Sequence, residues 1–474
     1  MKIYNTITRR KEELRPIHDD EVLMYVCGPT VYNYFHIGNA RPFVVFDTLR
    51  RYLEYRGRKV NFVQNFTDVD DKILARAAEE GVSSREIGDK YIAAYFEDAR
   101  ALGVRKATHH PRVTENMDAI IDFVKALVDK GHAYVVDGNV YFDTESWPRY
   151  GALSGQDVGE LRAGARIDVD ERKQSPLDFA LWKAAKEGED LSWDSPWGKG
   201  RPGWHIECSA MSKRYLGDTI DIHAGGQDLI FPHHENEIAQ SEAANGVTFS
   251  NAWMHNGYIT IDKEKMAKSK GNFFTVRDIL KDYDGETVRF FLLAGHYRGP
   301  IDFSKDLMEQ SKAALGRMRT ARDTLSHIAA KSDTEALTDA ERASLDALLK
   351  YKDKFIAAMD DDLNTADAIA AIFELIADVN TQIAAAGGAS KAYAQGALAL
   401  LLELANVLGL LETPAAGGGE EGEDPEVLAL IEARGKARAE KDWARADEIR
   451  DRLKAKGIVL KDTPQGVQII REGR

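Results

Sequence analysis

Residues 21–66, "EVLMYVCGPTVYNYFHIGNARPFVVFDTLRRYLEYRGRKVNFVQNF", decide the fold of this chain. The segments 21–27 and 59–66 are short apolar runs that suit a pleated strand. Pro42 stands between them where a first helical position is expected, and the apolar residues after it have helical spacing: Phe43, Phe46, Leu49 and Leu53. A strand–helix–strand unit of this length is typical of a parallel α/β sheet.

The bulk properties limit the class of protein. A chain of 474 residues is long enough for roughly three domains. Only two cysteines are present, which cannot form a disulfide scaffold and fit a reducing cytoplasm, the localisation that we expect. We identify no signal peptide and no apolar run of about 18 residues, so no membrane span is expected. The net charge of −14 argues against indiscriminate coating of nucleic acid.

Composition divides the chain into four parts. Residues 1–305 read as an α/β domain whose sheet is interrupted by an insertion at about 110–200, and α/β character returns at 218–262. Residues 306–412 are rich in Ala and Leu and indicate a helix bundle. Residues 413–425 form an acidic, Gly-rich linker, and 426–474 form a small module.

The small module differs in charge from the rest of the chain. Residues 431–474 contain 12 Lys and Arg against 8 Asp and Glu, a net charge of +4, so the remainder carries −18. A basic tail on an acidic protein suggests an anionic polymer as partner. A solvated helical face with i, i+4 ion pairs explains the charge equally well.

The loop in the opening stretch contains His-Ile-Gly-Asn at 36–39. A loop that leaves a parallel strand and enters a helix presents backbone N–H groups and the helix dipole, which favour phosphate. Gly38 lets a nucleotide approach the backbone, and His36 and Asn39 are candidate donors to developing negative charge. For four residues alone, an ordinary turn is the alternative.

Two later loops fit the same chemistry. "DKEKMAKSKGN" (262–272) follows an expected strand and offers a mobile cationic lid for a polyphosphate: Lys265, Lys268, Ser269 and Lys270. "HAGGQD" (223–228) leaves another strand, where Gly226 and Asp228 are candidates for contact with a nucleotide, the acid with its ribose. A solvated basic turn and a plain Gly-rich turn are the respective alternatives.

Four side chains of the types that zinc favours are candidates for one metal site: Cys27, Cys208, His233 and Glu237. His233 and Glu237 are four residues apart in an expected helix and so share one face. The chain has no Cys-x-x-Cys pair, and buried free cysteine is common, so simple packing stays an alternative. The neighbouring His234 and Glu235 leave the choice of ligands ambiguous from spacing alone.

Together these motifs resemble a known family. "HIGN", followed more than two hundred residues later by "KMAKS", is similar to the two signature motifs of class I aminoacyl-tRNA synthetases. "CGPTVYNYFHIGNARPFVVFD", "NFTDVDDKI", "RPGWHIECSAM", "FPHHENEIAQSE" and "MDDDLNT" resemble cysteinyl-tRNA synthetases over essentially the whole chain. The resemblance implies a Rossmann-type catalytic domain that activates L-cysteine with ATP and esterifies the terminal adenosine of the tRNA for cysteine.

The resemblance also implies roles in ATP binding. His36 and Asn39 face the triphosphate, and Lys265 and Lys268 stabilise its β- and γ-phosphates, with Mg²⁺ accompanying ATP. Two positions depart from the commonest class I pattern: Asn39 stands where His is frequent, and Ala267 where Ser is frequent. Neither change removes a lysine or the glycine, so activity is expected.

By the same resemblance, one zinc ion per chain is held by the four candidate ligands. A substrate thiol loses its proton and binds zinc directly, whereas the hydroxyl of serine is a far poorer ligand. A hydrophobic pocket discriminates such small differences by only roughly 1–3 kcal/mol. Thr67, Trp204 and His205 resemble the pocket residues around the amino acid, and for Trp204 an ordinary buried aromatic is the alternative.

The helix bundle and basic tail match the anticodon-side domains of that family. Trp443 is a candidate for stacking on an unpaired base, although packing inside a helix pair is slightly favoured. Arg434, Arg438 and Arg445 are candidate phosphate contacts. A monomer is expected.

Two other functions compete with this interpretation. A ligase that joins activated cysteine to an amino sugar shares the chemistry but lacks a full anticodon-binding region. A catalytically silent zinc- or RNA-binding paralogue is expected to have lost Lys265 and Lys268, which are present.

Overall fold

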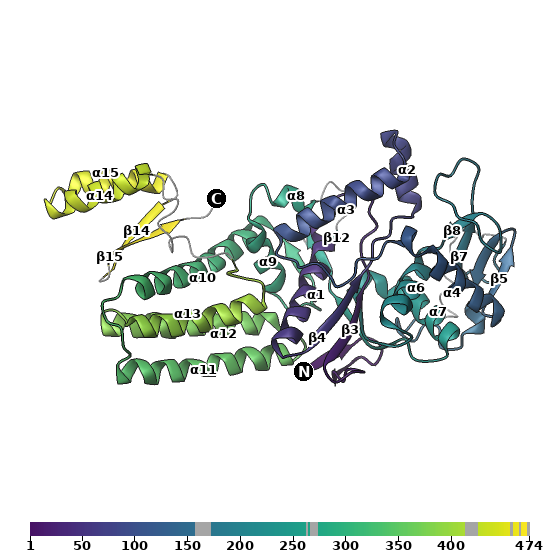
Figure 1. Cartoon of the computed structure of the whole chain (residues 1–474), viewed down its shortest axis with the longest axis horizontal. Coiled ribbons are helices and arrows are strands. Elements are labelled where there is room, and N and C mark those ends of the chain that lie inside the picture. Colours follow the sequence, from purple (N-terminus) through teal and green to yellow (C-terminus); the bar gives the residue numbers. More distant parts are fainter. Residues whose placement is uncertain are drawn as a thin grey trace. The chain divides into compact units, whose positions relative to one another are not determined.

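Figure 1 presents the chain as a computed structural model, which describes residues 1–156, 172–261, 264–265, 274–412, 425–455, 458–463 and 466–471. The chain forms two compact units. Unit 1 comprises Met1–Lys281, Tyr297–Phe303 and Asp361–Leu363. Unit 2 comprises Asp282–His296, Ser304–Asp360 and Asn364–Arg474.

A four-stranded parallel sheet in the order β10-β9-β3-β4 organises unit 1. Its strands are β3 (Glu21–Val26), β4 (Lys59–Gln64), β9 (Ile220–Gly226) and β10 (Ser250–Asn256). Most of their residues are buried, as expected where both faces of a parallel sheet are covered. The expected Rossmann-type sheet is confirmed, and β9 lies beside β3 although they are about two hundred residues apart in sequence.

The helix expected between β3 and β4 is α1 (Ile37–Tyr55), and its predicted apolar stripe is buried. The prediction that Pro42 is the first helical position is wrong, because the helix begins five residues earlier. The His36 side chain caps it, since its Nδ1 accepts the backbone N–H of Asn39 at 3.3 Å. Pro42 therefore lies inside the helix.

Three helices and a small antiparallel sheet fill the stretch between the two halves of the parallel sheet. The helices are α2 (Asp71–Glu80), α3 (Ser84–Ala101) and α4 (Met117–Asp129). The small sheet has the order β5-β6-β7-β8, with strands Ala133–Val136, Asn139–Phe142, Phe179–Ala184 and Gly200–Pro202. These elements lie between β4 and β9 in the chain and so interrupt the parallel sheet.

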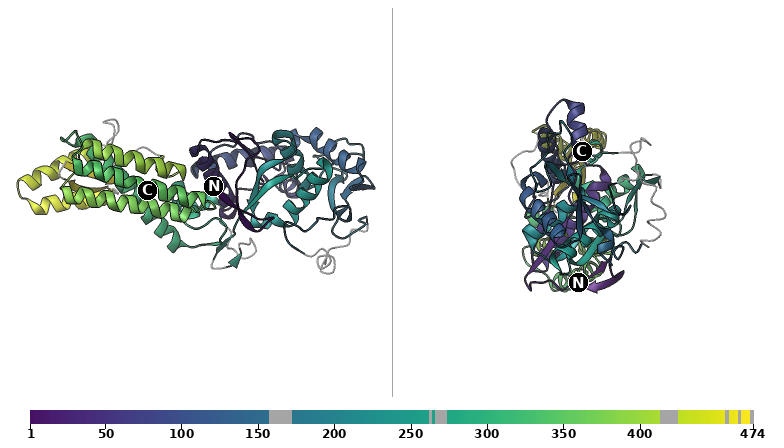
Figure 2. Two further views of the ribbon diagram at one scale, coloured as in Figure 1. Left: turned by 90° about the horizontal axis from the view of Figure 1, so that it is seen from below. Right: turned by 90° about the vertical axis from the view of Figure 1, so that its right-hand side faces the viewer.

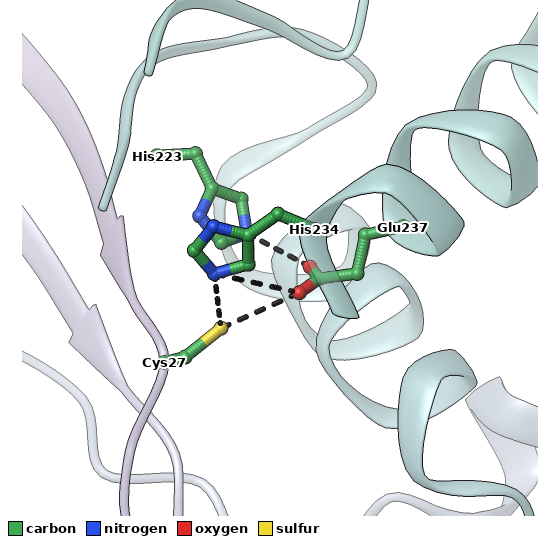
Figure 3. Close-up of side chains that lie close together, drawn as sticks. All are labelled: Cys27, His223, His234 and Glu237. Atoms are coloured by element: carbon green, nitrogen blue, oxygen red, sulfur yellow. Dashed lines mark hydrogen bonds and ion pairs between the residues drawn. The ribbon is translucent and has the colours of Figure 1, made fainter. Parts of the chain in front are cut away.

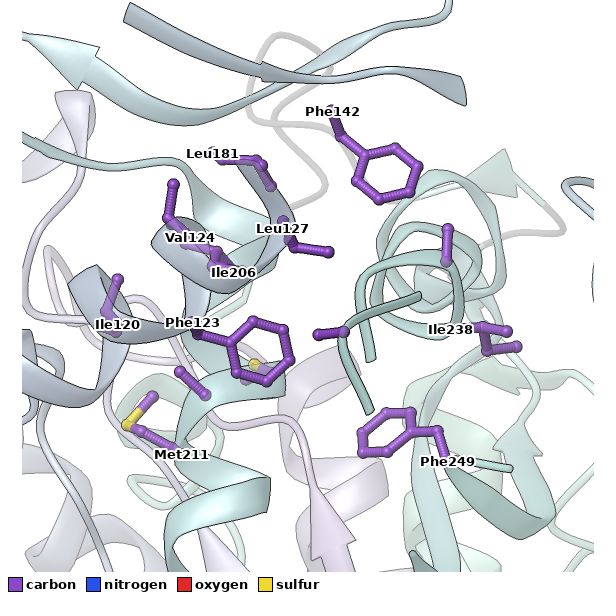
Figure 4. Close-up of a cluster of buried hydrophobic side chains, with 14 of the residues drawn as sticks. Ile120, Phe123, Val124, Leu127, Phe142, Leu181, Ile206, Met211, Ile238 and Phe249 are labelled. Atoms are coloured by element: carbon purple, nitrogen blue, oxygen red, sulfur yellow. The ribbon is translucent and has the colours of Figure 1, made fainter. Parts of the chain in front are cut away.

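Helices α6 (Trp204–Leu216) and α7 (Glu235–Asn245) return the chain to the parallel sheet. The sequence predicts that the helix holding His233 and Glu237 starts at about Pro232. The α-helix begins only at Glu235, because a wide helical turn over Ile230–His234 precedes it and Phe231 is extended there. Figure 4 shows part of the apolar core near these helices, including Phe123 and Ile206. This core holds the residues of α6 and α7 in place.

Short elements complete unit 1. Strands β1 (Lys2–Asn5) and β2 (Arg10–Glu13) form a hairpin, while β11 (Ile259–Ile261) lies between β12 (Glu264–Lys265) and β13 (Ile301–Phe303). The short helix α8 (Val276–Ile279) begins with a capping box formed by Thr275 and Asp278.

Unit 2 contains the expected helix bundle, and its helices run side by side in the views of Figure 1 and Figure 2. Its helices are α9 (Gly285–Leu293), α10 (Lys305–Lys331), α11 (Asp339–Asp360), α12 (Thr365–Ala386) and α13 (Lys391–Val407). The sequences "DDDLNT" (360–365) and "AAAGGAS" (384–390), which predict breaks in the helical pattern, mark the two ends of α12. In the described parts of the chain, α12 alone is long and apolar enough to cross a membrane, and its buried positions follow the 3–4 spacing of a bundle core helix.

The C-terminal module pairs two helices with a hairpin. They are α14 (Pro425–Ala439), α15 (Trp443–Ala455), β14 (Ile458–Thr463) and β15 (Gly466–Arg471). Its small core contains Val427, Leu430, Ile449 and Leu453. Most of the predicted linker at 413–425 lies outside the described residues.

Candidate functional site

The structure brings the four predicted metal ligands together. Cys27 directly follows β3, Cys208 lies on α6, His233 lies in the wide turn before α7, and Glu237 lies in the first turn of α7. All four are buried, and their ligand atoms lie within 4.8 Å of one another. Segments separated by up to about two hundred residues thus meet at the end of strand β3.

The distances within this cluster fit one tetrahedral ion. The two Sγ atoms are 3.7 Å apart, and Cys208 Sγ lies 3.6 Å from His233 Nε2. Glu237 Oε1 lies 3.4 Å from Cys27 Sγ and 3.1 Å from His233 Nε2. Zinc bond lengths of about 2.3 Å to sulfur and 2.0–2.1 Å to nitrogen or oxygen give tetrahedral edges of about 3.8, 3.5 and 3.3 Å. The donor set and its spacing therefore suit zinc.

A second set shares two of these residues: Cys27, His223, His234 and Glu237 (Figure 3). His223 Nε2 lies 2.8 Å from Glu237 Oε2, a hydrogen-bond distance shorter than a tetrahedral edge. His234 Nε2 lies 3.3 Å from Cys27 Sγ. These two rings are better placed to orient the ligands than to bind the ion.

The orienting contacts extend away from the cluster. His234 Nδ1 lies 2.8 Å from His255 Nε2, and His255 Nδ1 lies 2.8 Å from Thr6 Oγ1. His205 Nδ1 lies 2.9 Å from Nδ1 of His233. Sequence reasoning missed His223 and His255, each of which is a buried ring in a strand of the parallel sheet.

Glu235, which spacing left as an alternative ligand, has a different role. Its carboxylate accepts the backbone N–H groups of Gly151 at 2.9 Å, Leu153 at 3.4 Å and Ser154 at 2.8 Å. It is therefore committed to fastening the loop that follows the antiparallel hairpin. The ambiguity between the two glutamates is thus removed, since Glu237 contacts Cys27 Sγ whereas Glu235 binds the loop; His234 still lies beside Cys27.

The charges of the cluster are strongly coupled. The thiol of Cys27 donates to Cys208 and, with His233, lowers the pKa of Cys208 to about 6 despite burial. Burial raises the pKa of Cys27. Burial alone disfavours charge on Glu237 and His233, but His223 and His233 hold the pKa of Glu237 well below its usual value, and Glu237 raises that of His233 to about 10. A metal ion bound by these residues must displace the protons of Cys27 and His233, so its affinity depends on pH.

A cavity of about 510 Å³ connects the cluster to the predicted nucleotide-binding residues. Its lining includes the following predicted site residues: Cys27, His36, Gly38, Asn39, Trp204, Gly226 and Asp228. A Cβ at Gly226 would lie 2.4 Å from Asp228 Oδ1, so a side chain there would displace the Asp228 carboxylate. One cavity therefore borders both a candidate metal ligand and the His-Ile-Gly-Asn loop.

The His-Ile-Gly-Asn loop at 36–39 contacts residues 274–276, which follow the lysine-rich loop at 262–272. Ile37 N–H donates to Phe274 C=O at 3.2 Å, and Val276 N–H donates to Phe35 C=O at 3.1 Å. Because His36 Nδ1 accepts the helix-capping bond, the neutral ring carries its proton on Nε2. Lys265 ends β12, which pairs with β11. Lys268 and Ser269 lie outside the described residues.

The expected pocket residues differ in exposure. Trp204 is 40 % exposed and stacks on His233 at 4.2 Å between ring centroids, so the alternative of an ordinary buried aromatic is wrong. Thr67 is buried, and its hydroxyl donates to Glu207 Oε2 at 2.8 Å. His205 is half-buried beside His233.

The C-terminal module contains the residues that are candidates, from the sequence, for contact with tRNA. Trp443 is 59 % exposed, so the prediction that it packs inside the helix pair is wrong: Ala446, Ile449 and Leu453 form that buried face instead. Arg445 is exposed and Arg438 half-buried, whereas Arg434 is buried.

Three models of known protein domains match the chain. Residues 13–313 match the model of the tRNA synthetases class I (C) catalytic domain, 354–412 the DALR domain, and 420–471 the cysteinyl-tRNA ligase anticodon binding domain. The fold is similar to Mycobacterium tuberculosis methionyl-tRNA synthetase in complex with methionyl-adenylate (16 % identity, 82 % of this chain and 89 % of that chain, TM-score 0.59). It is also similar to the AgnB2 LeuRS of Agrobacterium radiobacter K84 in a ternary complex with tRNA and LeuAMS (12 %, 84 % and 85 %, 0.60). The chain belongs to the class I tRNA synthetases, in the cysteinyl-tRNA synthetase family.

Proposed function

We propose that this cysteine–tRNA ligase selects its amino acid through a zinc ion held by Cys27, Cys208, His233 and Glu237. The reaction joins L-cysteine and ATP to cysteinyl-adenylate and pyrophosphate, then transfers cysteine to the terminal adenosine of tRNA. The observation that carries the proposal is that Cys27 belongs both to the tetrahedral donor set and to the lining of the cavity next to the His-Ile-Gly-Asn loop. Selection of sulfur and activation of the carboxylate then occur in one cavity.

The chain's own residues prepare this site. Zinc bound there supplies a direct bond to sulfur that the hydroxyl of serine cannot match. His223 and His234 fix the orientation of Glu237 and Cys27 through the short contacts described above. Trp204 covers His233 at the edge of the cavity and narrows the space beside the substrate.

ATP binding is assigned to the loops that border the cavity. His36 presents its Nε2 proton to the phosphates, Gly38 admits them to the backbone, and Asn39 donates from its amide. Gly226 and Asp228 face the ribose, as an acid does at the end of a strand in dinucleotide-binding folds. Lys265, Lys268 and Ser269 are proposed to close over the β- and γ-phosphates, with Mg²⁺ bound to ATP.

The C-terminal module is proposed to contact the anticodon loop of the tRNA for cysteine. Exposure of the Trp443 ring at the start of α15 supports stacking on an unpaired base. Arg445 and Arg438 are the accessible candidates for phosphate contact, while burial of Arg434 favours a structural role. The division into residues 1–305, 306–412, 413–425 and 426–474 stays a prediction, as do a monomeric state and a cytoplasmic localisation.

Amino acid-dependent ATP–pyrophosphate exchange followed by tRNA charging tests the proposal. We expect exchange with cysteine, none above background with serine, and charging of tRNA. Exchange without tRNA charging is the result expected of an amino-sugar ligase, and no exchange with either amino acid is that of a silent paralogue.

The variant Cys208→Ser isolates the metal site. We expect bound zinc and affinity for cysteine to fall together, because a thiolate ligand is lost. Ser212→Ala is the matched control: Ser212 is buried one turn later on α6, and its hydroxyl has no hydrogen-bond partner among the described residues. Unchanged metal content in Cys208→Ser would remove Cys208 from the site.

A further inference from the structure

Tyr25 is a fully buried residue whose place in the fold brings it to the metal cluster. It lies on β3 two positions before Cys27, so the two side chains leave the strand on the same face. Its register partner on β9 is His223, and the two rings are 5.2 Å apart between centroids. The Tyr25 hydroxyl is therefore placed by the same strands that place the ligands.

The hydroxyl of Tyr25 has no hydrogen-bond partner of ordinary geometry among the described residues. A buried hydroxyl without a partner costs free energy, so such a group calls for an explanation. Tyr25 belongs to the same buried cluster as Cys27 and Cys208, whose Sγ atoms lie 3.7 Å apart. A tyrosine hydroxyl carries a proton that it can donate, and here it lies among candidate metal ligands.

Each of the four candidate ligands also contacts a side chain outside the ligand set, and these outer contacts differ in chemistry. Glu237 contacts His223 at 2.8 Å, Cys27 contacts His234 at 3.3 Å, and His233 contacts His205 at 2.9 Å. Cys208 differs, because its outer contact is the side-chain oxygen of Asn65 at 3.8 Å, which accepts hydrogen bonds and donates none. Once Cys208 is a thiolate, the Asn65 oxygen cannot donate a hydrogen bond to it, so the thiolate needs a donor from another residue.

We propose that Tyr25 is a positioning residue of the metal centre, whose O–H donates a hydrogen bond to the thiolate of Cys208. The proposal rests on the proposed zinc site. Of the four candidate ligands, Cys208 has no other hydrogen-bond donor beside it from outside the ligand set among the described residues, and the buried hydroxyl of Tyr25 has no acceptor of ordinary geometry. A hydrogen bond to a thiolate withdraws electron density from sulfur, so the metal receives less charge and attracts the substrate thiol more strongly.

The variant Tyr25→Phe removes only the hydroxyl and keeps the ring. Cobalt(II) loaded into the full chain gives a sulfur-to-cobalt charge-transfer band that reports on the thiolates. We expect the band of Tyr25→Phe to move to longer wavelength, zinc affinity to fall roughly 10- to 100-fold, and KM for cysteine to rise while KM for ATP is unchanged. The metal-free variant should be as stable as the wild type or more so, because an unpaired hydroxyl has been removed.

Tyr297→Phe is the matched control, since Tyr297 is a buried residue of unit 1 whose hydroxyl donates to Asp362 Oδ1 at 2.8 Å. It should destabilise the metal-free and metal-loaded chains equally and leave the cobalt band in place. An unchanged band and unchanged zinc affinity in Tyr25→Phe overturn the inference but leave the zinc site standing. Absence of a sulfur band from the wild type overturns both.

Discussion

Gly28 directly follows Cys27, and its surroundings leave no room for a side chain. A Cβ at Gly28 would lie 1.6 Å from the backbone oxygen of Asn65, whereas real Cβ atoms essentially never come within 3.0 Å of another heavy atom. Gly28→Ala therefore forces the two backbones apart by about 1.4 Å in an interior too dense to absorb the change. Asn65 is fully buried, and its chain neighbours are hydrogen-bonded to residues 109 and 111, so the end of β3 is the part that moves.

The displaced strand end carries Cys27 with it. Metal sites hold their ligand distances to within about 0.2 Å, so a shift of about 1.4 Å is several times the tolerance. We expect zinc affinity in Gly28→Ala to fall by at least about 100-fold, beyond the effect of losing one orienting hydrogen bond. Overpacking should lower the free energy of unfolding by about 1–3 kcal/mol.

Competition of the full chain with a chromogenic chelator measures the zinc affinity, and cysteine-dependent pyrophosphate exchange measures KM for cysteine. Gly316→Ala is the control, because Gly316 lies inside α10 and a Cβ there meets no other atom within 4 Å. It should keep wild-type zinc affinity and gain up to about 1 kcal/mol of stability. Wild-type zinc affinity together with wild-type KM for cysteine in Gly28→Ala would refute the steric reasoning.

Three further predictions concern other parts of the molecule. Burial lowers the pKa of His110 from 6.5 to about 4, so the contribution of the neutral ring to stability is complete above pH 6.5 and is lost as pH falls towards 4. Between pH 6.5 and pH 4, the free energy of unfolding of the wild type should fall by about 3 kcal/mol more than that of His110→Gln. Parallel plots of the free energy of unfolding against pH for the two proteins would contradict this. Trp443→Ala should raise KM for tRNA roughly 5- to 150-fold, with Trp443→Phe intermediate and pyrophosphate exchange unchanged; an unaltered KM for tRNA speaks against stacking. Chelation under reducing conditions should abolish cysteine-dependent exchange and zinc should restore it, whereas a zinc-free chain of full activity excludes the proposed metal role.

The fold was largely predictable because its signals are local. The apolar runs at 21–27 and 59–66 became two parallel strands, and the stripe from Phe43 to Leu53 became the buried face of α1. The start of α1 was misplaced, since capping by the His36 imidazole depends on a side-chain rotamer that no sequence pattern reports. The start of α7 was misplaced for a similar reason, because the wide turn at 230–234 still reads as helical in sequence.

The site was predictable only in part. The four candidate ligands came from the family resemblance, and spacing alone left Glu235 as an alternative until its bonds to the 151–154 loop were known. The orienting groups His223, His255 and Tyr25 were not found, because their roles depend on register between strands distant in sequence. Pairing of β9 with both β3 and β10 brings these three strand residues into one polar cluster.

X-ray absorption at the zinc K-edge of the zinc-loaded full chain, with and without cysteine, shows whether the thiolate of the substrate binds the metal. We expect two sulfur and two nitrogen or oxygen neighbours in the free protein, from Cys27, Cys208, His233 and Glu237. We expect three sulfur neighbours once cysteine is added and no change with serine. A sulfur count that stays at two in saturating cysteine would contradict selection of the substrate through its thiolate.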